Sequence, residues 1–268
     1  MHFVVCAKQI LDPEAPPSAF RVDGASNEVI PPQGIAPVLS PFDAIAAEAA
    51  LRIKDDSDQE LTITVISMGA ESASAAIKQV LAMGADEALL LDDDAFEGGD
   101  WYTTARVLAT AIQKLGDVDA VFCGRQAADW DMGQVGLGIG ELLGWPCAII
   151  ARDVQLGDGE LSVQRVLEDG FETVRMALPA VVTVSNELGE PRYPKLPQIM
   201  RAAKKEVTRW TADDLGLDPA SVGVPGARLK LERLFVPTVE GEVEIMEGDT
   251  PEEQAEALAR ALREAKIL

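Results

Sequence analysis

Residues 123–136 read Cys-Gly-Arg-Gln-Ala-Ala-Asp-Trp-Asp-Met-Gly-Gln-Val-Gly, and they join an apolar run to a helical pattern. The residues just before them, Asp-Ala-Val-Phe-Cys at 119–123, predict a buried strand, and residues 133–143 predict a helix. The loop between them therefore lies at the carboxyl end of a sheet, beside a helix N-terminus whose free N–H groups attract phosphate. This junction predicts an α/β fold with a phosphate-binding loop.

The glycines of this stretch allow two interpretations. Gly136, Gly138 and Gly140 fall inside the predicted helix, whereas the dinucleotide pattern G-x-G-x-x-G opens a helix. The sequence also lacks the phosphate-loop pattern G-x-x-x-x-G-K-[ST]. The three glycines are equally compatible with close packing of the helix on the sheet. A nucleotide loop of unusual type and a packing device both stay open.

Strand-like runs alternate with helical patterns over the first two thirds of the chain. Strands are predicted at residues 3–7, 61–67, 88–91 and 120–123. Helices are predicted at residues 41–54, 71–83 and 101–115. Helical crossovers of this kind build a parallel sheet covered on both faces, so the expected fold is Rossmann-like α/β.

Two helix starts carry clear signals. In the sequence Ser-Pro-Phe-Asp, Ser40 suits the N-cap, Pro41 the first helical position and Asp43 the acid of a capping box. A similar start, Thr-Pro-Glu-Glu at 250–253, begins a last helix at 251–266. The apolar stripe of that helix consists of Ala255, Leu258, Ala259 and Leu262.

The pattern of the sequence changes from residue 147 onward. Residues 147–184 contain short β-rich runs with Gly- and Asp-rich turns, which predict hairpins that extend the sheet. Residues 206–248 are rich in Gly and Pro, with a single short strand predicted at 243–245. We therefore expect an α/β nucleotide-binding domain at 1–205 and an extended C-terminal arm at 206–268 that lies on another chain.

Composition excludes several classes of protein. The chain has 268 residues, 47% of them hydrophobic, and a formal net charge of −22, which argues against nucleic acid and anionic membranes as partners. No apolar run predicts a transmembrane span or a signal peptide, so we expect a cytoplasmic protein, or a mitochondrial matrix protein in a eukaryote. The single basic segment, which is either a solvated helix face or a partner surface, contains Arg192, Lys195, Arg201, Lys204, Lys205 and Arg209 against Glu206 alone.

The inventory of reactive side chains is small. Cys6, Cys123 and Cys147 lack metal-binding spacing, and two of them close predicted strands, which indicates buried thiols. The only histidine is His2, so histidine-based triads and multi-histidine metal sites are excluded. We expect no catalytic side chain and no metal ligand.

Six motifs in order along the chain resemble the β subunit of electron-transfer flavoproteins. They are Val5-Cys6-Ala7-Lys8-Gln9, Ser40-Pro41-Phe42-Asp43, Ala82-Met83-Gly84-Ala85-Asp86, Gly124-Arg125-Gln126-Ala127 through Asp131 and Gln134, Leu178-Pro179-Ala180-Val181, and Glu190-Pro191-Arg192-Tyr193. The resemblance covers nearly the whole chain. It implies an adenine nucleotide alpha hydrolase-like version of the Rossmann-like fold, and an α subunit that shares FAD with this chain.

The resemblance also implies a nucleotide inside the β subunit itself. That nucleotide is AMP in the common members and a second FAD in electron-bifurcating members. The residues that the resemblance assigns to it are Cys6, Ser40, Pro41, Phe42, Asp43, Met68, Gly124, Arg125, Gln126, Ala127, Ala128, Asp129, Trp130, Asp131, Met132, Gly133, Gln134 and Val135. Most of them lie at the strand ends and helix starts that the residue pattern had selected for phosphate.

A second implied site is a loop that recognises partner dehydrogenases. It consists of Arg192, Tyr193, Pro194, Lys195, Leu196, Pro197, Gln198, Ile199, Met200 and Arg201. Leu196 is the implied apolar anchor, and its flanking prolines stiffen the loop and lower the entropy lost on binding. Lys204 and Lys205 are expected to steer an acidic partner. Core packing is the other interpretation of Leu196.

Three departures limit the resemblance. Gly189 stands where many members have Asn, and Val166 where some have a Glu that faces the flavin region. The loop sequence Asp-Trp-Asp-Met-Gly at 129–133 differs from the Asp-Gly-Asp-Thr-Ala common in bifurcating members, whereas residues 94–100 and 103–105 look like that group. The implied partners are acyl-CoA or related dehydrogenases, as in fatty acid β-oxidation, and a quinone oxidoreductase or other acceptor. NADH-oxidising bifurcation and a stand-alone adenine-nucleotide sensor or hydrolase are the alternatives.

Overall fold

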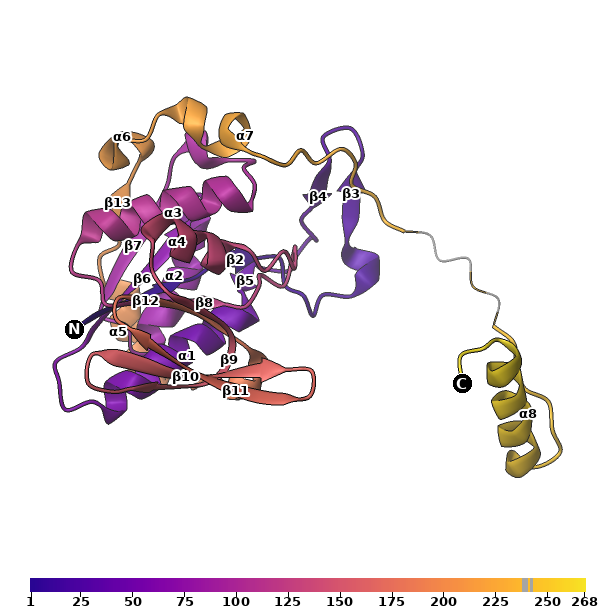
Figure 1. Ribbon diagram of the computed structural model, residues 1–268. Coiled ribbons are helices and arrows are strands. Elements are labelled where there is room, and N and C mark those ends of the chain that lie inside the picture. Colours follow the sequence, from indigo (N-terminus) through magenta and orange to yellow (C-terminus); the bar gives the residue numbers. More distant parts are fainter. Residues whose placement is uncertain (238–240, 242) are drawn as a thin grey trace.

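The computed structural model describes residues 1–237, 241 and 243–268, and its centre is a nine-stranded sheet (Figure 1). The strand order is β11-β10-β9-β12-β8-β1-β6-β7-β13. In this order, the seven strands β9, β12, β8, β1, β6, β7 and β13 are all parallel to their neighbours. The other two strands form antiparallel pairs, since β10 pairs antiparallel with both β9 and β11. The strands are β1 (His2–Cys6), β6 (Thr62–Met68), β7 (Glu87–Leu91), β8 (Ala120–Gly124), β9 (Cys147–Leu156), β10 (Glu160–Leu167), β11 (Gly170–Ala177), β12 (Ala180–Val184) and β13 (Thr208–Trp210).

Helices cover both faces of this sheet. They are α1 (Pro41–Asp56), α2 (Ser74–Met83), α3 (Trp101–Leu115), α4 (Val135–Leu143), α5 (Leu196–Lys204), α6 (Ala212–Leu215) and α7 (Gly223–Gly226), whereas α8 (Pro251–Glu264) lies away from the sheet (Figure 1). Two small antiparallel pairs complete the fold: β2 (Gln9–Ile10) with β5 (Val38–Leu39), and β3 (Arg21–Asp23) with β4 (Glu28–Ile30). The expected Rossmann-like α/β fold with a β-rich extension is confirmed.

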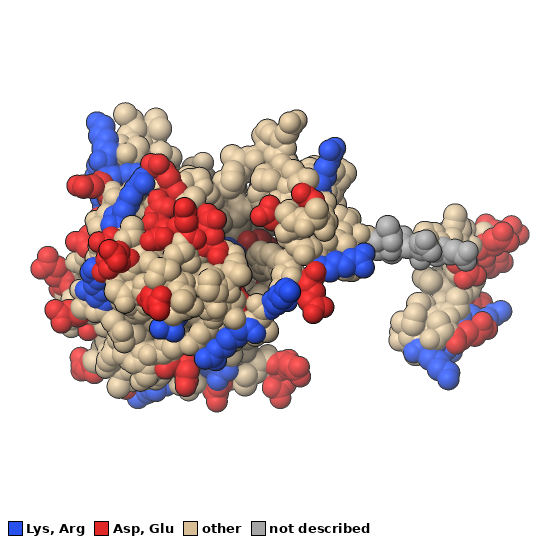
Figure 2. Space-filling model, turned by 90° about the horizontal axis from the view of Figure 1, so that it is seen from above, with Lys and Arg blue, Asp and Glu red and all other residues tan. Residues whose placement is uncertain are grey.

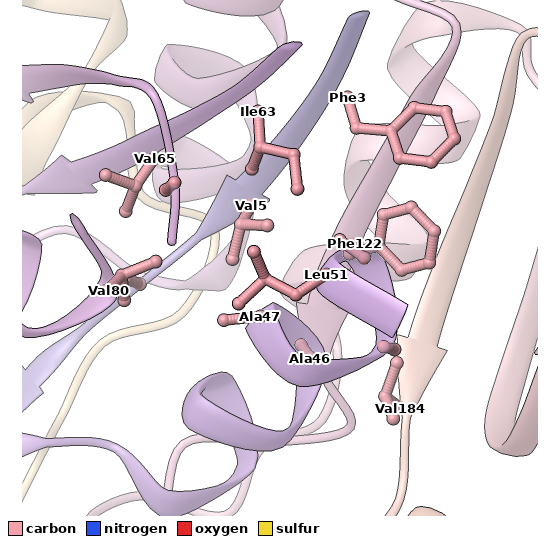
Figure 3. Packing of buried hydrophobic residues seen from close by; sticks show 14 of the residues in the cluster. Phe3, Val5, Ala46, Ala47, Leu51, Ile63, Val65, Val80, Phe122 and Val184 are labelled. Carbon is pink, nitrogen blue, oxygen red and sulfur yellow. The ribbon is translucent and has the colours of Figure 1, made fainter. Parts of the chain in front are cut away.

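Two apolar clusters hold the layers together. One cluster joins α1, α2 and α5 to one face of the sheet, and the other joins α3, α4 and α6 to the opposite face. Figure 3 shows Leu51, Ala46 and Ala47 of α1 over the sheet residues Phe3 and Phe122, whose ring centroids lie 5.3 Å apart. Alanines on α1 let the helix approach the sheet closely, and full burial of such rings stabilises the fold by about 2 kcal/mol or more each.

The predicted elements mostly match the observed ones. The helix expected at 133–143 begins later, at Val135, and the one expected at 71–83 begins with a 3₁₀ turn at Glu71–Ala73. The hairpins expected in 147–184 are β9, β10 and β11. The strand expected at 243–245 is wrong, because these residues form no strand and Val243 and Ile245 are exposed. The sequence analysis also missed β13, whose register pairs Thr208 with Leu89.

The C-terminal region has two parts. Residues 208–226 lie on the α/β body, where β13 extends the sheet and α6 and α7 contact α3. Beyond residue 229 the described chain leaves the body, and α8 has no buried residue (Figure 1). Thr250 caps α8 as expected, since its hydroxyl accepts from the N–H of Glu253. The division into residues 1–205 and 206–268 stays a prediction, but part of 206–268 packs on the body.

Candidate functional site

The sheet has a switch point between β1 and β8. From β1 the chain proceeds through β6 and β7 on one side, then crosses to β8 on the other side of β1. Open α/β sheets bind ligands in the crevice outside the carboxyl ends of the strands at such a point. Cys6 at the end of β1, Met68 at the end of β6 and Gly124 at the end of β8 lie at this edge, together with the start of α1.

Asp43 of α1 joins the ends of β1 and β8. One carboxylate oxygen accepts from the N–H of Lys8 at 2.8 Å, and the other accepts from the N–H of Gly124 at 3.0 Å. A Cβ on Gly124 would lie 2.6 Å from the Asp43 carboxylate, so glycine is required for this approach. Burial raises the pKa of Asp43 to about 7, although the two backbone hydrogen bonds act in the opposite direction.

The expected capping box at the start of α1 is wrong. The Ser40 side chain makes no cap hydrogen bond, and Asp43 turns to the strand ends instead. Pro41 does occupy the first helical position. The carboxylate instead satisfies two N–H groups at the strand ends, which would cost free energy if they were buried without an acceptor.

The loop after β8 is held by Lys8, which follows β1, and by a hydrogen bond between two of its own side chains. The Lys8 ammonium contacts both oxygens of Asp129, at 2.8 and 2.9 Å, and Gln126 donates to Asp131 at 2.7 Å. Asp131 and Gly133 have φ values of 51° and 64°, in the left-handed region that favours glycine. The loop is therefore shaped before any ligand arrives, and it leads directly into α4.

The glycines of α4 are packing residues. A Cβ on Gly136 would lie 2.5 Å from Thr183 of β12, and one on Gly138 would lie 2.8 Å from Ala105 of α3. Gly140 approaches Cys147 of β9 in the same way. The packing interpretation of these glycines is confirmed, and it brings the N-terminus of α4 down onto the sheet edge beside the loop.

Three side-chain atoms around the start of α1 and the loop after β8 are buried without a hydrogen-bond partner in the described part of the chain. They are the Ser40 hydroxyl, Nε of Arg125 and Oε1 of Gln134. The Arg125 guanidinium lies 4.9 Å from the Phe42 ring centroid, and Nη1 donates to the Ser185 hydroxyl at 3.4 Å. Buried polar groups normally have partners, so a bound group that accepts from Arg125 and donates to Gln134 fits here. Phosphate oxygens and ribose hydroxyls have these properties.

Two cavities differ in their relation to this edge. A cavity of about 230 Å³ opens beside the loop and is lined by Arg125, Gln126, Asp131, Met132, Gly133, Leu137, Ile149, Ile150 and Thr183. A larger cavity of about 420 Å³ lies at the amino ends of β6, β7 and β13. There the Lys205 ammonium already donates to the carbonyls of Ala85 and Asp86. The smaller cavity is the better candidate because it lies at the carboxyl ends of the strands.

The remaining residues of the predicted nucleotide site surround this crevice. Cys6 is buried, and Met68 is half-buried at the end of β6. Ala127, Ala128 and Val135 are partly covered, while Trp130 and Met132 are about half exposed, at 50% and 46%. The sequence analysis did not assign Lys8 to the site, although its place directly after the first strand was a usable signal.

The predicted recognition segment forms a second surface, away from the crevice. Tyr193 is 91% exposed and Leu196 is 69% exposed at the start of α5, so core packing of Leu196 is wrong. Ile199 and Met200 extend the apolar surface along the helix. Pro197 lies in the first turn, and Gln198 accepts from the N–H of Lys195 at 2.7 Å, which fixes the helix start.

Half of the six basic side chains of this segment contact groups of the same chain. Arg192 pairs with Glu48 and Asp55, and Arg209 pairs with Glu71 and Asp92. The Lys205 ammonium donates to two carbonyls of the same chain, so its charge is held at a fixed place, and its steering role stays a prediction. Figure 2 shows Asp and Glu side chains spread over the face seen from above, with Lys and Arg between them, as the net charge requires.

The described helices include none that combines the length and apolar character of a membrane span.

The fold and the crevice define a Rossmann-like α/β protein with a preformed loop at its switch point. Residues 29–215 match the family described as "Electron transfer flavoprotein domain". The chain therefore belongs to the electron transfer flavoprotein β subunit family, as its full-length relatives also show.

Three relatives illustrate the match. "Caffeyl-CoA reductase-Etf complex subunit CarD" of Acetobacterium woodii is 38% identical over 268 residues, and the match covers 100% of both chains. "Electron transfer flavoprotein subunit beta" of Clostridium acetobutylicum is 38% identical over 267 residues, again with 100% coverage of both. "Protein FixA" of Azorhizobium caulinodans is 35% identical over 266 residues, covering 96% of this chain and 92% of that protein.

Proposed function

We propose that this chain is the β subunit of a heterodimeric electron-transfer flavoprotein that passes electrons from dehydrogenases through FAD to a quinone oxidoreductase or another acceptor. Family membership over the full chain carries the proposal. The FAD shared with the α subunit supplies the electron chemistry when bound. This chain contributes position and charge, so it needs no side chain as acid, base or nucleophile.

The crevice at the switch point is the proposed site of an adenine nucleotide, AMP or the ADP portion of a second FAD. Backbone N–H groups at the start of α4 face the phosphates, and Arg125 donates to them from its place over the Phe42 ring. Asp43 and the Lys8–Asp129 pair keep the loop in its binding shape. The unpartnered atoms of Ser40, Arg125 and Gln134 support this assignment.

The remaining proposals concern partners. The segment from Arg192 to Arg201 meets acyl-CoA or related dehydrogenases, with Leu196 as its anchor. Residues beyond 227 dock on the α subunit, because α8 presents Leu258 and Leu262 and buries neither within this chain. No observation separately favours bifurcation, in which a second FAD in the crevice would exchange electrons with NADH.

A count of cofactors tests the proposal. The chain is co-expressed with a candidate α subunit from the same organism, and the purified heterodimer is analysed for flavin and AMP. One FAD with one AMP supports the electron carrier, and two FAD support the bifurcating alternative. A heterodimer that binds no flavin, or a stable isolated chain that hydrolyses ATP, would overturn the proposal.

A further inference from the structure

The part of the C-terminal arm that begins at residue 228 leaves the α/β body beside α3. The carboxylate of Asp100 binds both α3 and this part of the arm. Oδ1 of Asp100 accepts from the N–H groups of Tyr102 and Thr103, at 3.1 Å each, and so caps α3. Oδ2 accepts from the N–H groups of Arg228 and Leu229, at 2.7 and 2.9 Å. Partial burial raises the pKa of Asp100, but the four backbone hydrogen bonds outweigh it and lower the pKa.

A second side chain that binds the arm lies on the β3–β4 hairpin, which projects from the body next to the arm (Figure 1). Asn27 ends the hairpin turn with a φ of 59°, a left-handed conformation that Asn tolerates. Its Nδ2 donates to the carbonyl of Glu232 at 3.2 Å, and its Oδ1 accepts from the N–H of Leu234 at 2.9 Å. The side-chain amide thus pairs with the arm as a neighbouring strand would.

Aromatic contacts add to these hydrogen bonds. The guanidinium of Arg228 lies over the Tyr102 ring at 3.6 Å from its centroid, which fixes the arm against α3. Figure 2 shows the surface hollowed between the α/β body and the lobe that contains the hairpin. The arm therefore crosses from one to the other along a course that this chain sets by itself.

The held segment presents apolar side chains to its surroundings. Leu229, Leu231, Phe235 and Val236 are exposed by 44% to 58%. The segment lies outside residues 29–215, which match the family domain, yet full-length relatives named as subunits include it. A segment that relatives share outside the common domain fits a contact that is specific to this subunit. We therefore infer that the α subunit covers these apolar side chains.

We propose that Asn27 and Asp100 are positioning residues for heterodimer assembly, which preset the course of residues 228–236 before the α subunit binds. The inference rests on the proposed function, since it needs an α subunit. A segment whose course is already fixed loses less entropy on binding. The β3–β4 hairpin then serves as a guide for the arm.

Two variants separate this role from folding. Asn27→Gly removes the side chain but suits the positive φ, so the hairpin turn keeps its shape. Asp100→Asn keeps an oxygen for the cap of α3, and Asn is as good an N-cap as Asp, but it places an amide against the N–H groups of Arg228 and Leu229. Gly24→Ala is the matched control, because a Cβ there meets nothing within 4 Å.

Hydrogen exchange of the full-length free chain is the first measurement. The amides of residues 228, 229 and 234 are expected to be protected in the wild type and in Gly24→Ala. Each positioning variant is expected to raise exchange on the order of 10-fold at the amides that lose their acceptor, since a hydrogen bond contributes about that factor. Amides of α3 should be unchanged in Asp100→Asn.

The second measurement is the rate at which the chain associates with its α subunit, followed by flavin fluorescence. Both positioning variants are expected to associate about 10-fold more slowly, with little change in dissociation. Unchanged association in both variants would overturn the inference while leaving the heterodimer itself intact. A chain that binds no α subunit at all would instead overturn the proposed function. Self-association of the chain through residues 228–236 would also overturn the inference, because a second copy of this chain would then cover the segment.

Discussion

The buried carboxylate of Glu48 on α1 accepts three hydrogen bonds from Arg192. The backbone N–H and Nε of Arg192 lie 3.1 and 2.7 Å from Oε2, and Nη2 lies 3.3 Å from Oε1. Arg52 joins the same carboxylate at 2.9 Å and donates to the carbonyls of Leu188 and Glu190. This network fixes the chain that leads into the exposed surface of α5.

The first prediction is that Glu48→Ala destabilises the protein by about 2 kcal/mol, because it removes the buried acceptor of Arg192 and leaves that charge only its exposed partner Asp55. Arg175→Ala, which removes a pair at 3.8 Å between exposed side chains, is the control and should cost less than about 1 kcal/mol. Urea unfolding of both variants measures the difference. Equal costs would show that the Glu48 network contributes no more than a surface pair.

The same network has a pH signature. Burial raises the pKa of Glu48, but the hydrogen bonds from Arg192 and Arg52 outweigh it and hold the pKa below its usual 4.5. The stabilisation is therefore complete above pH 4.5 and is lost as the pH falls through the lower native value. Glu48→Gln should have a smaller loss of stability in that acid range than the wild type.

Asp43 is predicted to act in the opposite direction. Burial raises its pKa from 3.8 to about 7, so the native state binds a proton that the unfolded state has released. Its contribution to stability should fall by about 1.4 kcal/mol per pH unit as the pH rises between these values. Asp43→Asn cannot titrate, so the difference in unfolding free energy between wild type and variant should shrink from pH 5 to pH 7. A constant difference would contradict the raised pKa.

The parallel core could be predicted from the sequence because its strands are long apolar runs separated by helices of regular period. The edge strand β13 could not. Its three residues include exposed Thr208 and Arg209, so they carry no apolar pattern, and only their pairing with β7 makes them a strand.

The switch-point crevice was predictable from the sequence as a candidate site, but the contacts inside it were not. Residue spacing predicted that Asp43 would cap its own helix, whereas its acceptors serve N–H groups 35 and 81 residues away in the chain. Tertiary partners at that separation leave no trace in local spacing. For the same reason Glu48, an acid on an otherwise apolar helix face, gave no sign that it holds Arg192.

The next prediction concerns the loop before α4. Gly133→Val should remove the nucleotide from the purified heterodimer, because the φ of 64° strains a β-branched residue and a Cβ would lie 3.3 Å from the Arg125 carbonyl. Gly144→Val, at a φ of 68° in open space beyond the other end of α4, is the matched control and should keep the nucleotide. Extraction and chromatography of the bound nucleotide report the result. Stoichiometric nucleotide in Gly133→Val would rule out close approach at this loop.

Deletion of residues 250–268 should weaken heterodimer formation without unfolding the α/β body. The reason is that α8 contributes no buried residue to the described chain, while its stripe of Leu258 and Leu262 is free to pack on a partner. Thermal unfolding of the isolated chain should change little, and gel filtration with the α subunit should show loss of the complex. Collapse of the isolated chain, or an unchanged complex, would contradict the docking role.

The last prediction separates the anchor from the charges on the recognition surface. Leu196 is 69% exposed within this chain, so Leu196→Ala should leave the fold, the heterodimer and the flavin spectrum intact. Truncation of a central apolar anchor typically costs about 2 kcal/mol or more and acts on dissociation. Removal of a peripheral charge, as in Lys204→Ala, mainly slows association and weakens its salt dependence.

Val224 on α7 offers the control for this experiment, because it is exposed to nearly the same extent, 67%, on a different surface. Stopped-flow reduction of the flavin by a substrate-loaded dehydrogenase should be slower for Leu196→Ala at subsaturating partner concentrations, and unchanged for Val224→Ala. The Lys204→Ala rate should approach the wild-type rate as salt is added, since screening removes the contribution of the charge. If Leu196→Ala and Val224→Ala reduce at the same rate, the dehydrogenase contacts another face, and the apolar surface of α5 needs a different partner.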